Sequence, residues 1–374
     1  MTELEYRLSS TVLRVLGWVF GWLPPHPRRV VLASPRKAEL DGNLLHLDGA
    51  IRTLRPDWER VHLLEPYGYG LRAKLAYAVR MVRAIFHLRT AALVVVDNAY
   101  LPVHVGPHPA RTTVVQVWHA AGALKRFGMD TEPPPSEPER SFLHRHYDWV
   151  VASGEASREP WSRALRTPPD HVVALGSART DGLVNETAVA AARSRVLAAY
   201  PALGGKRVVT YAPTFRGRGR GKRPAGTLDA ARLRAALPSG DVLVLKSHPN
   251  LDPILVDTAG FDVVVDPGED VNDLLAATDI LVTDYSSSIF EFALLRRPII
   301  LLVPDLEAYE REPGLYLDYR TEMIGTQVGD TDAVAEAIRE GSFDLAPYPA
   351  FIARHLGACD GRASARFVER FLAR

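Results

Sequence analysis

The sequence predicts an α/β protein made of two halves, each built around a parallel β-sheet. Short runs rich in β-branched residues recur along the chain, and helical patterns separate them. The runs are continuously apolar, as expected for parallel strands covered on both faces. With 374 residues, the chain is long enough for two domains. We expect a cleft between the two halves.

Eleven runs are predicted to be strands, and we assign them to two domains at residues 28–184 and 185–345. In the first domain the strands are expected at 29–34, 61–65, 92–97, 113–118, 149–153 and 172–175. In the second they are expected at 207–212, 242–246, 262–265, 280–283 and 298–303. An amphipathic helix is predicted within residues 1–27, an alanine-rich helix at 187–200, and a helical C-terminal segment at 346–374.

Composition excludes several classes of protein. Hydrophobic residues make up 47% of the chain and charged residues 24%, which is typical of a globular protein. The formal net charge of +1 gives no global attraction to nucleic acid. Cys359 is the single cysteine, so an intrachain disulfide and a cysteine-based zinc cluster are both excluded. A reducing compartment fits this cysteine content.

The N-terminal helix has an apolar stretch at residues 12–23. It is about a dozen residues long and contains Arg14, whereas a spanning helix needs roughly 20 apolar residues. Its broad apolar face carries Trp18 and Trp22, which suits a helix lying in a membrane interface. A helix packed against its own domain or against a partner explains the pattern equally well.

Two basic segments stand out. Residues 74–89 form an amphipathic pattern with Arg80, Arg83 and His87 on one stripe. A crossover helix with a solvated outer face is the favoured interpretation, and contact with a membrane surface is the alternative. Residues 216–223, RGRGRGKR, read as a mobile loop. Such a loop either captures an anionic lipid surface or a phosphate-rich substrate, or is a solvated linker.

Polar residues follow four of the predicted strands at their carboxyl ends, where ligands bind in open α/β sheets. They are His119 after 113–118, Thr214 and Arg216 after 207–212, Lys246 and His248 at the end of 242–246, and Asp284 with Ser286, Ser287 and Ser288 after 280–283. We therefore expect a functional site to be assembled from these four clusters.

The residue types in these clusters indicate phosphate chemistry. His119 is followed by small residues and could accept a proton from a hydroxyl group, although a structural histidine is the alternative. Lys246 and His248 suit an anionic group, with a surface turn as the alternative. Ser288 and Glu291 match a capping box, and a helix start preceded by serines also suits a phosphate. Glu291 could instead accept hydrogen bonds from a ribose.

Five stretches, in this order, resemble the CDP-glycerol glycerophosphotransferase family, the teichoic acid primases and polymerases. They are QVWHAAGALKRFG (116–128), YAPTFRG (211–217), LKSHPN (245–250), VNDLLAATDILVTDYSSSIFEFALLRRPII (271–300) and DLEAYEREPGLYLDY (305–319).

The resemblance implies a GT-B-like fold, in which 28–184 is the acceptor domain and 185–345 the CDP-polyol donor domain. It also implies roles for individual residues. His119 would be the base, and His248 with Lys246 would stabilise the donor phosphates. Ser286, Ser287 and Ser288 would hold the diphosphate and Glu291 the ribose. Thr214, Arg216 and Asp284 would line the donor side, and Lys125, Arg179 and Asp181 would be further cleft residues.

The function implied is transfer of a polyol phosphate, with glycerol phosphate favoured, from a CDP-polyol to a hydroxyl of a lipid-linked acceptor, with release of CMP. The product would belong to teichoic acid or a related surface polymer. The length of the chain corresponds to the catalytic core of the family alone, which favours the addition of a single polyol phosphate to each acceptor. We expect a cytoplasmic enzyme, peripheral on the inner face of the cell membrane, with an anionic membrane surface and no nucleic acid as partner.

Asp279 and Asp284 are too isolated in the sequence to suggest a metal site, so no metal and no cofactor beyond the donor substrate is expected. A GT-B glycosyltransferase that uses a nucleotide sugar is the first alternative. A non-catalytic protein that binds a surface polymer is the second.

Overall fold

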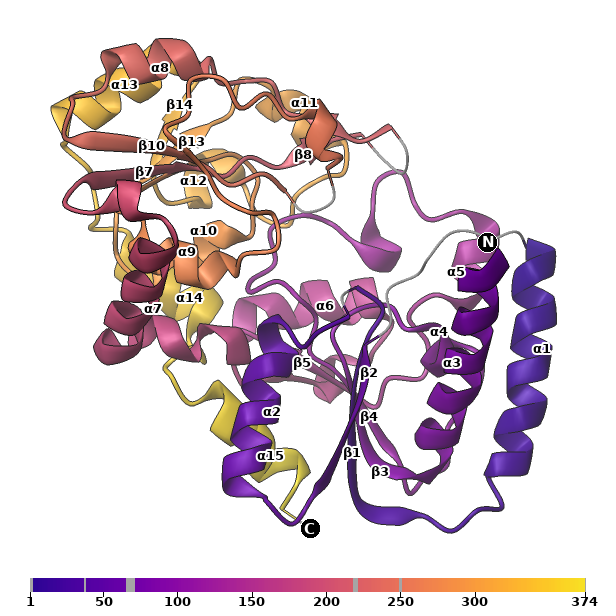
Figure 1. Cartoon of the computed structure of the whole chain (residues 1–374). Helices are drawn as coiled ribbons and strands as arrows, with labels where there is room; N and C mark the ends of the chain where they lie inside the picture. Colours follow the sequence, from indigo (N-terminus) through magenta and orange to yellow (C-terminus); the bar gives the residue numbers. More distant parts are fainter. Residues whose placement is uncertain (1–2, 37, 65–70, 218–220, 249–250, 374) are drawn as a thin grey trace. The chain divides into compact units, whose positions relative to one another are not determined.

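The computed structural model describes residues 3–36, 38–64, 71–217, 221–248 and 251–373. The chain forms two compact units (Figure 1). The first unit contains Met1–Ala120, Arg126–Asp181 and Gly357–Arg374, and the second contains Ala121–Lys125 and Gly182–Leu356. The five residues Ala121–Lys125 therefore belong to the second unit although both of their flanks belong to the first.

The first unit is built on a six-stranded parallel sheet with the strand order β2-β1-β3-β4-β5-β6. The strands are β1 (His26–Ser34), β2 (Glu59–Leu64), β3 (Ala91–Val96), β4 (Thr113–Gln116), β5 (Trp149–Ala152) and β6 (Val172–Ala174). All six predicted strands are confirmed, with ends that differ by at most three residues. Glu65, the predicted end of the second strand, lies outside the described residues.

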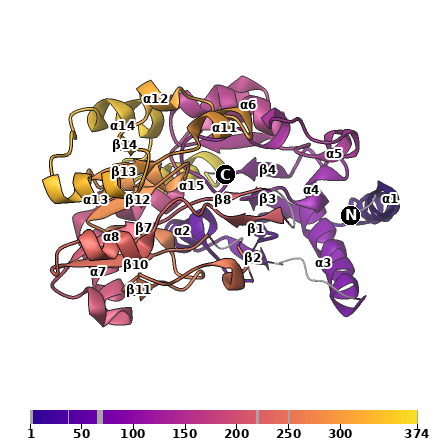
Figure 2. The same cartoon turned by 90° about the horizontal axis from the view of Figure 1, so that it is seen from above.

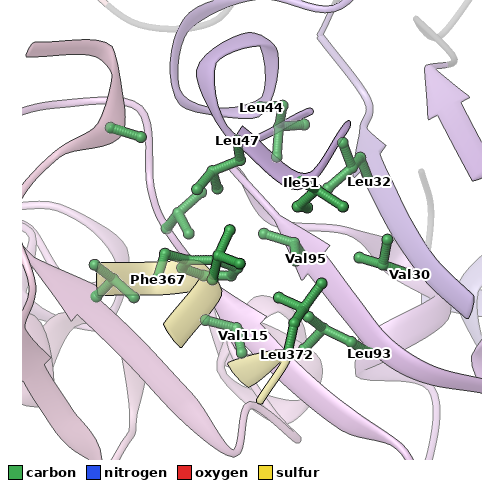
Figure 3. Close-up of a cluster of buried hydrophobic side chains, with 14 of the residues drawn as sticks. Val30, Leu32, Leu44, Leu47, Ile51, Leu93, Val95, Val115, Phe367 and Leu372 are labelled. Carbon is green, nitrogen blue, oxygen red and sulfur yellow. The ribbon is translucent and has the colours of Figure 1, made fainter. Parts of the chain in front are cut away.

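Seven α-helices of the described residues belong to this unit. They are α1 (Glu3–Phe20), α2 (Gly42–Leu54), α3 (Leu71–Thr90), α4 (Leu101–His104), α5 (Glu137–Phe142), α6 (Arg158–Leu165) and α15 (Ala363–Phe371). Leu44, Leu47 and Ile51 of α2 pack with Phe367 of α15 over the sheet, together with residues of β1, β3 and β4 (Figure 3). The C-terminal helix is thus part of the core of the first unit.

Helix α1 lies against α3 at the margin of the first unit (Figures 1 and 2). It packs through Ser10, Leu13 and Gly17, all of which are buried. The face with small and polar residues therefore points toward the protein, while Trp18 and Trp22 stay exposed. Among the described residues, no helix is long and apolar enough to cross a membrane.

Helix α3 is the crossover between β2 and β3, as predicted, but its basic stripe is not uniformly solvated. His87 is buried, and burial together with the nearby charges of Arg29 and Arg83 lowers its pKa to about 4. The expectation of a solvated outer face through His87 is wrong, because the last turns of α3 pack against the sheet. Arg83 is exposed.

The second unit repeats the architecture with the strand order β11-β10-β7-β12-β13-β14, again all parallel. Its strands are β7 (Arg207–Tyr211), β10 (Asp241–Leu245), β11 (Val263–Val264), β12 (Ile280–Thr283), β13 (Ile299–Leu302) and β14 (Thr326–Val328). A separate short hairpin joins β8 (Phe215–Arg216) to β9 (Arg223–Pro224). Counted from β7, the order of the six strands is 3-2-1-4-5-6, as in a dinucleotide-binding fold.

The helices of the second unit are α7 (Glu186–Ala199), α8 (Ala230–Ala236), α9 (Val271–Ala277), α10 (Ser288–Ala293), α11 (Leu306–Arg311), α12 (Tyr319–Glu322), α13 (Thr331–Glu340) and α14 (Tyr348–Leu356). They enclose two apolar clusters on the sheet, one centred on Leu233, Val282 and Val334 and the other on Val196, Val244 and Leu274. The predicted helix at 187–200 is confirmed as α7.

Candidate active site

The strand order of the second sheet reverses between β7 and β12, and the loops that follow these two strands are joined by hydrogen bonds. The hydroxyl of Thr283 donates to the carbonyl of Ala212 at 2.6 Å. The backbone N–H and the hydroxyl of Thr214 donate to the two carboxylate oxygens of Asp284, at 2.8 and 3.0 Å. In an open α/β sheet this switch point is where a ligand binds.

Arg216 links this pair of loops to a third one. Its guanidinium donates to Asp284 at 2.9 Å and to Asp305 at 2.7 and 3.1 Å. Burial opposes the charge of Asp305, but hydrogen bonds from Arg216 and Tyr285 hold the pKa of this carboxyl below its usual value. Because both carboxylates are engaged by Arg216, the guanidinium is fixed in place. It is not part of a mobile loop, as the basic segment 216–223 suggested. Residues 218–220 of that segment lie outside the described residues.

Two stacked tyrosines support the same guanidinium. The rings of Tyr285 and Tyr309 lie 3.7 Å apart, and the guanidinium carbon of Arg216 is 5.1 and 5.0 Å from their centroids. The hydroxyl of Tyr285 donates to Asp305 at 3.0 Å. Tyr285, Tyr309 and Asp305 thus orient the cation beside the switch point.

Lys125 brings a second cation to this place. It belongs to the segment Ala121–Lys125, which is held to the second unit by the hydrogen bond from the N–H of Tyr316 to the carbonyl of Leu124. The Lys125 ammonium lies 5.4 Å from the ring centroid of Tyr309. Burial and the charge of Arg216 lower the pKa of Lys125 to about 8, against the opposite influence of Asp284. No carboxylate forms an ion pair with Lys125 in the described part of the chain, so its charge is available to an anion.

The serines stand at the start of α10, but they do not form the predicted capping box. Ser288 is the first residue of the helix, and Ser287 before it already has helical backbone angles and makes no side-chain capping bond. The hydroxyl of Ser286 instead accepts a bond from the N–H of Ser288 at 3.3 Å and pairs with its hydroxyl at 2.7 Å. The prediction failed because Ser288 is already inside the helix, and Ser287 at the cap position has helical backbone angles, whereas a capping residue is normally extended. Glu291 is buried one turn further into the helix.

Lys246 and His248 follow β10 in the same unit. The Lys246 ammonium is buried and donates to the carbonyls of Asp266 and Pro267 at 2.8 and 2.9 Å. The ring of His248 meets the edge of Phe215 in the short hairpin, with centroids 4.8 Å apart. Lys246 therefore fixes a neighbouring turn, and its predicted contact with donor phosphates stays a prediction, as does that of His248.

His119 belongs to the first unit, where hydrogen bonds fix its backbone. Nη1 of Arg179 donates to the His119 carbonyl at 3.0 Å. Nδ2 of the buried Asn43 donates to the carbonyls of Val117 and Trp118, at 3.3 and 2.8 Å. Trp118 has a φ of +50°, which is unfavourable for a bulky residue and is a strain typical of functional sites.

Aromatic contacts hold Trp118 in this conformation. Its ring stacks on Phe127 and lies against His119, with centroids 4.5 Å apart in both cases. The predicted place of Asp181 among the cleft residues stays a prediction, and the structure shows a structural contact of its carboxylate. Its two carboxylate oxygens accept the N–H groups of Ala363 and Ser364 at 2.9 Å, so it anchors the start of α15.

No group of three or more metal-ligating side chains is present in the described ranges. The two carboxylates at the switch point, Asp284 and Asp305, both pair with Arg216 and neutralise its charge, so Lys125 is the cation beside them that has no carboxylate partner among the described residues. The expectation that no metal ion and no other cofactor takes part stays a prediction.

The sequence did not predict a role for some residues that hold the site in place. Asp305 and Tyr309 lie in one of the five stretches that carry the family resemblance, so the signal was present without a role attached. Asn43 lies outside all five stretches. Only the fold shows that its side chain reaches the residues before His119.

Comparison with known proteins decides the family. Residues 19–373 match the family described as CDP-Glycerol:Poly(glycerophosphate) glycerophosphotransferase. The chain belongs to this family. It is thus an enzyme of the phosphotransferase class, related to the teichoic acid primases and polymerases.

The chain is similar both to teichoic acid primases and to teichoic acid polymerases. A teichoic acid ribitol-phosphate primase of Bacillus spizizenii is 31% identical, and the match covers 98% of this chain and 99% of the primase. A teichoic acid poly(glycerol phosphate) polymerase of Bacillus subtilis is 32% identical over 91% of this chain, but the match covers only 47% of the polymerase. The chain thus spans about half the length of the polymerase.

A solved structure of the wall teichoic acid polymerase TagF shares the fold. The TM-score is 0.78 at 19% sequence identity, with 99% of this chain and 97% of that chain covered. The expected GT-B-like α/β fold with two parallel-sheet domains is confirmed. A UDP-GlcNAc 2-epimerase from Neisseria meningitidis is more distant in structure, with a TM-score of 0.53 at 15% identity.

Proposed function

We propose that this enzyme transfers a polyol phosphate from a CDP-polyol to a hydroxyl group of a lipid-linked acceptor and releases CMP. The observation that carries the proposal is the cation Lys125 at the switch point of the second sheet, beside an Arg216 whose charge is neutralised. Arg216 is fixed by two carboxylates, and Lys125 has no carboxylate partner among the described residues. Beside them, the loop after β12 presents Ser286, Ser287 and Ser288, which suits a diphosphate.

The proposed reaction is an in-line phosphoryl transfer. His119 accepts the proton of the acceptor hydroxyl, and the oxygen attacks the phosphorus that carries the polyol. The bond from this phosphorus to the oxygen of CMP breaks, and CMP leaves. Lys125 stabilises charge on the donor phosphates, with His248 as a second contributor. Positioning and charge stabilisation supply most of the catalysis in such reactions. We propose that protein cations suffice and that no metal ion is needed.

We further propose a single addition, on the basis of the similarity to a ribitol-phosphate primase. Similarity to enzymes named for ribitol phosphate and for glycerol phosphate makes CDP-ribitol as good a donor candidate as the CDP-glycerol that the sequence favoured. The acceptor would be a lipid-linked saccharide or polyol phosphate.

A membrane contact through α1 is part of the proposal. Val12, Val15 and Val19 form an exposed strip with Trp18 and Trp22, whose exposed fractions are 68% and 78%. Exposed indoles on an amphipathic helix are typical of membrane interfaces. The enzyme would then work as a peripheral protein on the cytoplasmic face, where a lipid-linked acceptor is within reach.

The choice of donor tests the function. The chain is titrated separately with CDP-glycerol, CDP-ribitol, UDP-sugars and GDP-sugars, while its melting temperature is followed. We expect stabilisation by at least one CDP-polyol and none by the nucleotide sugars. Stabilisation by a nucleotide sugar alone would favour a glycosyltransferase. Tight binding of a CDP-polyol without turnover on any lipid-linked acceptor would favour a binding protein.

A further inference from the structure

A hollow lies at the opposite end of the first sheet from His119. It encloses about 530 Å³ where the chain enters several strands, among them β1 at His26, β4 at Thr113 and β5 at Trp149. His119 follows the carboxyl end of β4, whereas Thr113 begins that strand. The hollow is therefore separate from the residues proposed for the reaction.

Aromatic and basic side chains line this hollow. The aromatic ones are Trp58, Trp149 and Phe371, and the basic ones are His26, Arg28, Arg111 and Arg370. None of the residues that line it is acidic. We call it the basic hollow. Guanidinium groups beside flat apolar walls suit an anionic group that is attached to an apolar body.

The positive charge of the basic hollow is only partly balanced. Arg370 lies over the ring of Trp149, 4.8 Å from its centroid, and Arg111 donates only to backbone carbonyls. Neither forms an ion pair with a carboxylate anywhere in the described ranges. Arg28 forms an ion pair with the exposed carboxylate of Asp57, with 3.5 Å between Nη1 and Oδ2. An anion entering the hollow would thus meet two uncompensated guanidinium charges.

The basic hollow is tied to the end of α1. Nη2 of Arg111 donates to the carbonyls of Gly21 and Leu23, at 3.1 and 3.4 Å. These residues flank Trp22, the most exposed indole of the strip proposed to meet the membrane. A lipid whose chains lie along this strip would therefore have its headgroup near the hollow.

We propose that the basic hollow binds the phosphate group of an anionic membrane lipid. The guanidinium groups of Arg28, Arg111 and Arg370 take the phosphate, and Trp58 with the other apolar walls of the hollow covers the glycerol part. The inference extends the proposed membrane contact and does not depend on the identity of the donor or of the acceptor.

The test uses short-chain lipid, so that it does not require insertion of α1 into a bilayer. The full chain is titrated by calorimetry with monomeric dihexanoyl-phosphatidylglycerol, with dihexanoyl-phosphatidylcholine and with inorganic phosphate. We expect the phosphatidylglycerol to bind at least tenfold more tightly than either of the others. Arg370→Glu and, independently, Arg28→Glu should each weaken its binding at least tenfold.

Arg339→Glu is the matched control, because it makes the same change of charge at an exposed position of α13 in the second unit. It should change the affinity less than twofold. Equal losses in Arg339→Glu and Arg370→Glu would overturn the proposal, as would inorganic phosphate binding as tightly as the lipid, which would indicate a soluble ligand. CMP release from a CDP-polyol is measured on the same preparations, so that failure of the proposed reaction is recognised separately.

Discussion

Asn43 holds the backbone of Trp118, the residue directly before His119. Its Nδ2 donates to the Trp118 carbonyl at 2.8 Å. Its Oδ1 accepts the hydroxyl of Ser177 at 3.0 Å and the N–H of Arg179 at 2.9 Å. One buried amide therefore joins the start of α2, the loop that carries the proposed base and the segment that leads out of the first unit.

Asn43→Ala should slow turnover without weakening the binding of the CDP-polyol. The substitution leaves buried carbonyls unpaired, each at a cost of about 1–3 kcal/mol, and frees the backbone beside His119. We expect kcat to fall about tenfold or more, while the donor Kd, set by the second unit, stays within twofold. Steady-state kinetics and calorimetry measure the two quantities. Asn185→Ala, which removes the N-cap of α7, is a control that lowers stability by about 1 kcal/mol without touching this loop. An equal loss of kcat in both variants would show a general effect of stability.

Gly122→Ala should displace the segment Ala121–Lys125 from its packed position in the second unit. Gly122 has a φ of +72°, and an added Cβ would lie 2.4 Å from the ring of Phe290 in α10. We expect weaker donor binding, because Lys125 follows three residues later, and a loss of stability of about 1–3 kcal/mol from the steric conflict in addition to backbone strain. Gly205→Ala is the control, since Gly205 has a φ of +70° and open space around it. Urea unfolding and donor titration of both variants separate steric conflict from backbone strain. Similar results for the two would refute the role of the contact with Phe290.

Donor binding should weaken as the pH rises through 8. Burial lowers the pKa of Lys125 to about 8, so the free enzyme loses this charge between pH 7 and 9. We expect the Kd of the CDP-polyol to rise about tenfold over this interval and to stay flat in Lys125→Arg, since an arginine keeps its charge. The contribution of Lys125 to folding stability changes with pH in the opposite direction to donor binding. The unfolded chain binds the proton more tightly, so this contribution rises between pH 8 and 10.5. A flat Kd profile in the unsubstituted enzyme would exclude Lys125 as the phosphate contact.

The exposed strip of α1 should carry vesicle binding. Replacing Trp18 and Trp22 by serine removes two large exposed apolar side chains. Each contributes about 1.5 kcal/mol or more when it is buried in a membrane, so each replacement should weaken vesicle binding roughly tenfold. Co-sedimentation with vesicles that contain phosphatidylglycerol measures the loss. Ile254→Ser removes an exposed apolar side chain from the second unit and should have little effect. Unchanged sedimentation of the double variant would show that α1 is not the contact.

The sequence was sufficient for most of the sheet framework, because continuous β-branched runs have few other interpretations. It missed β14, a three-residue strand with the polar residues Thr326 and Gln327 that shows no apolar run. It also could not show that α15 returns to the first unit. That placement depends on Asp181 capping α15 and on Phe367 packing beside α2, both of which are contacts between residues distant in the sequence.

The site was predictable where its residues follow a strand and less so where function depends on contacts across the fold. Asp284, Thr214 and Arg216 were found from their positions after β7 and β12. The environment of a side chain was not predictable in the same way. Lys246 was predicted to suit an anionic group, and the sequence did not show that its ammonium donates to two carbonyls. Lys125 lies near Arg216 because its segment joins the second unit, which the sequence did not show either.

The most direct test of the account is the product balance of the reaction with and without His119. The enzyme is incubated with a lipid-linked disaccharide acceptor and either CDP-glycerol or CDP-ribitol. Chromatography then quantifies the CMP, and mass spectrometry measures the mass of the acceptor. The account predicts one CMP for each polyol phosphate added, and a rate about 10²–10⁴ lower in His119→Ala with donor binding preserved. His62→Ala, at an exposed histidine of the same unit, should keep the full rate. CMP release at a near-normal rate by His119→Ala, or CMP release without a gain of mass in the acceptor, would contradict it.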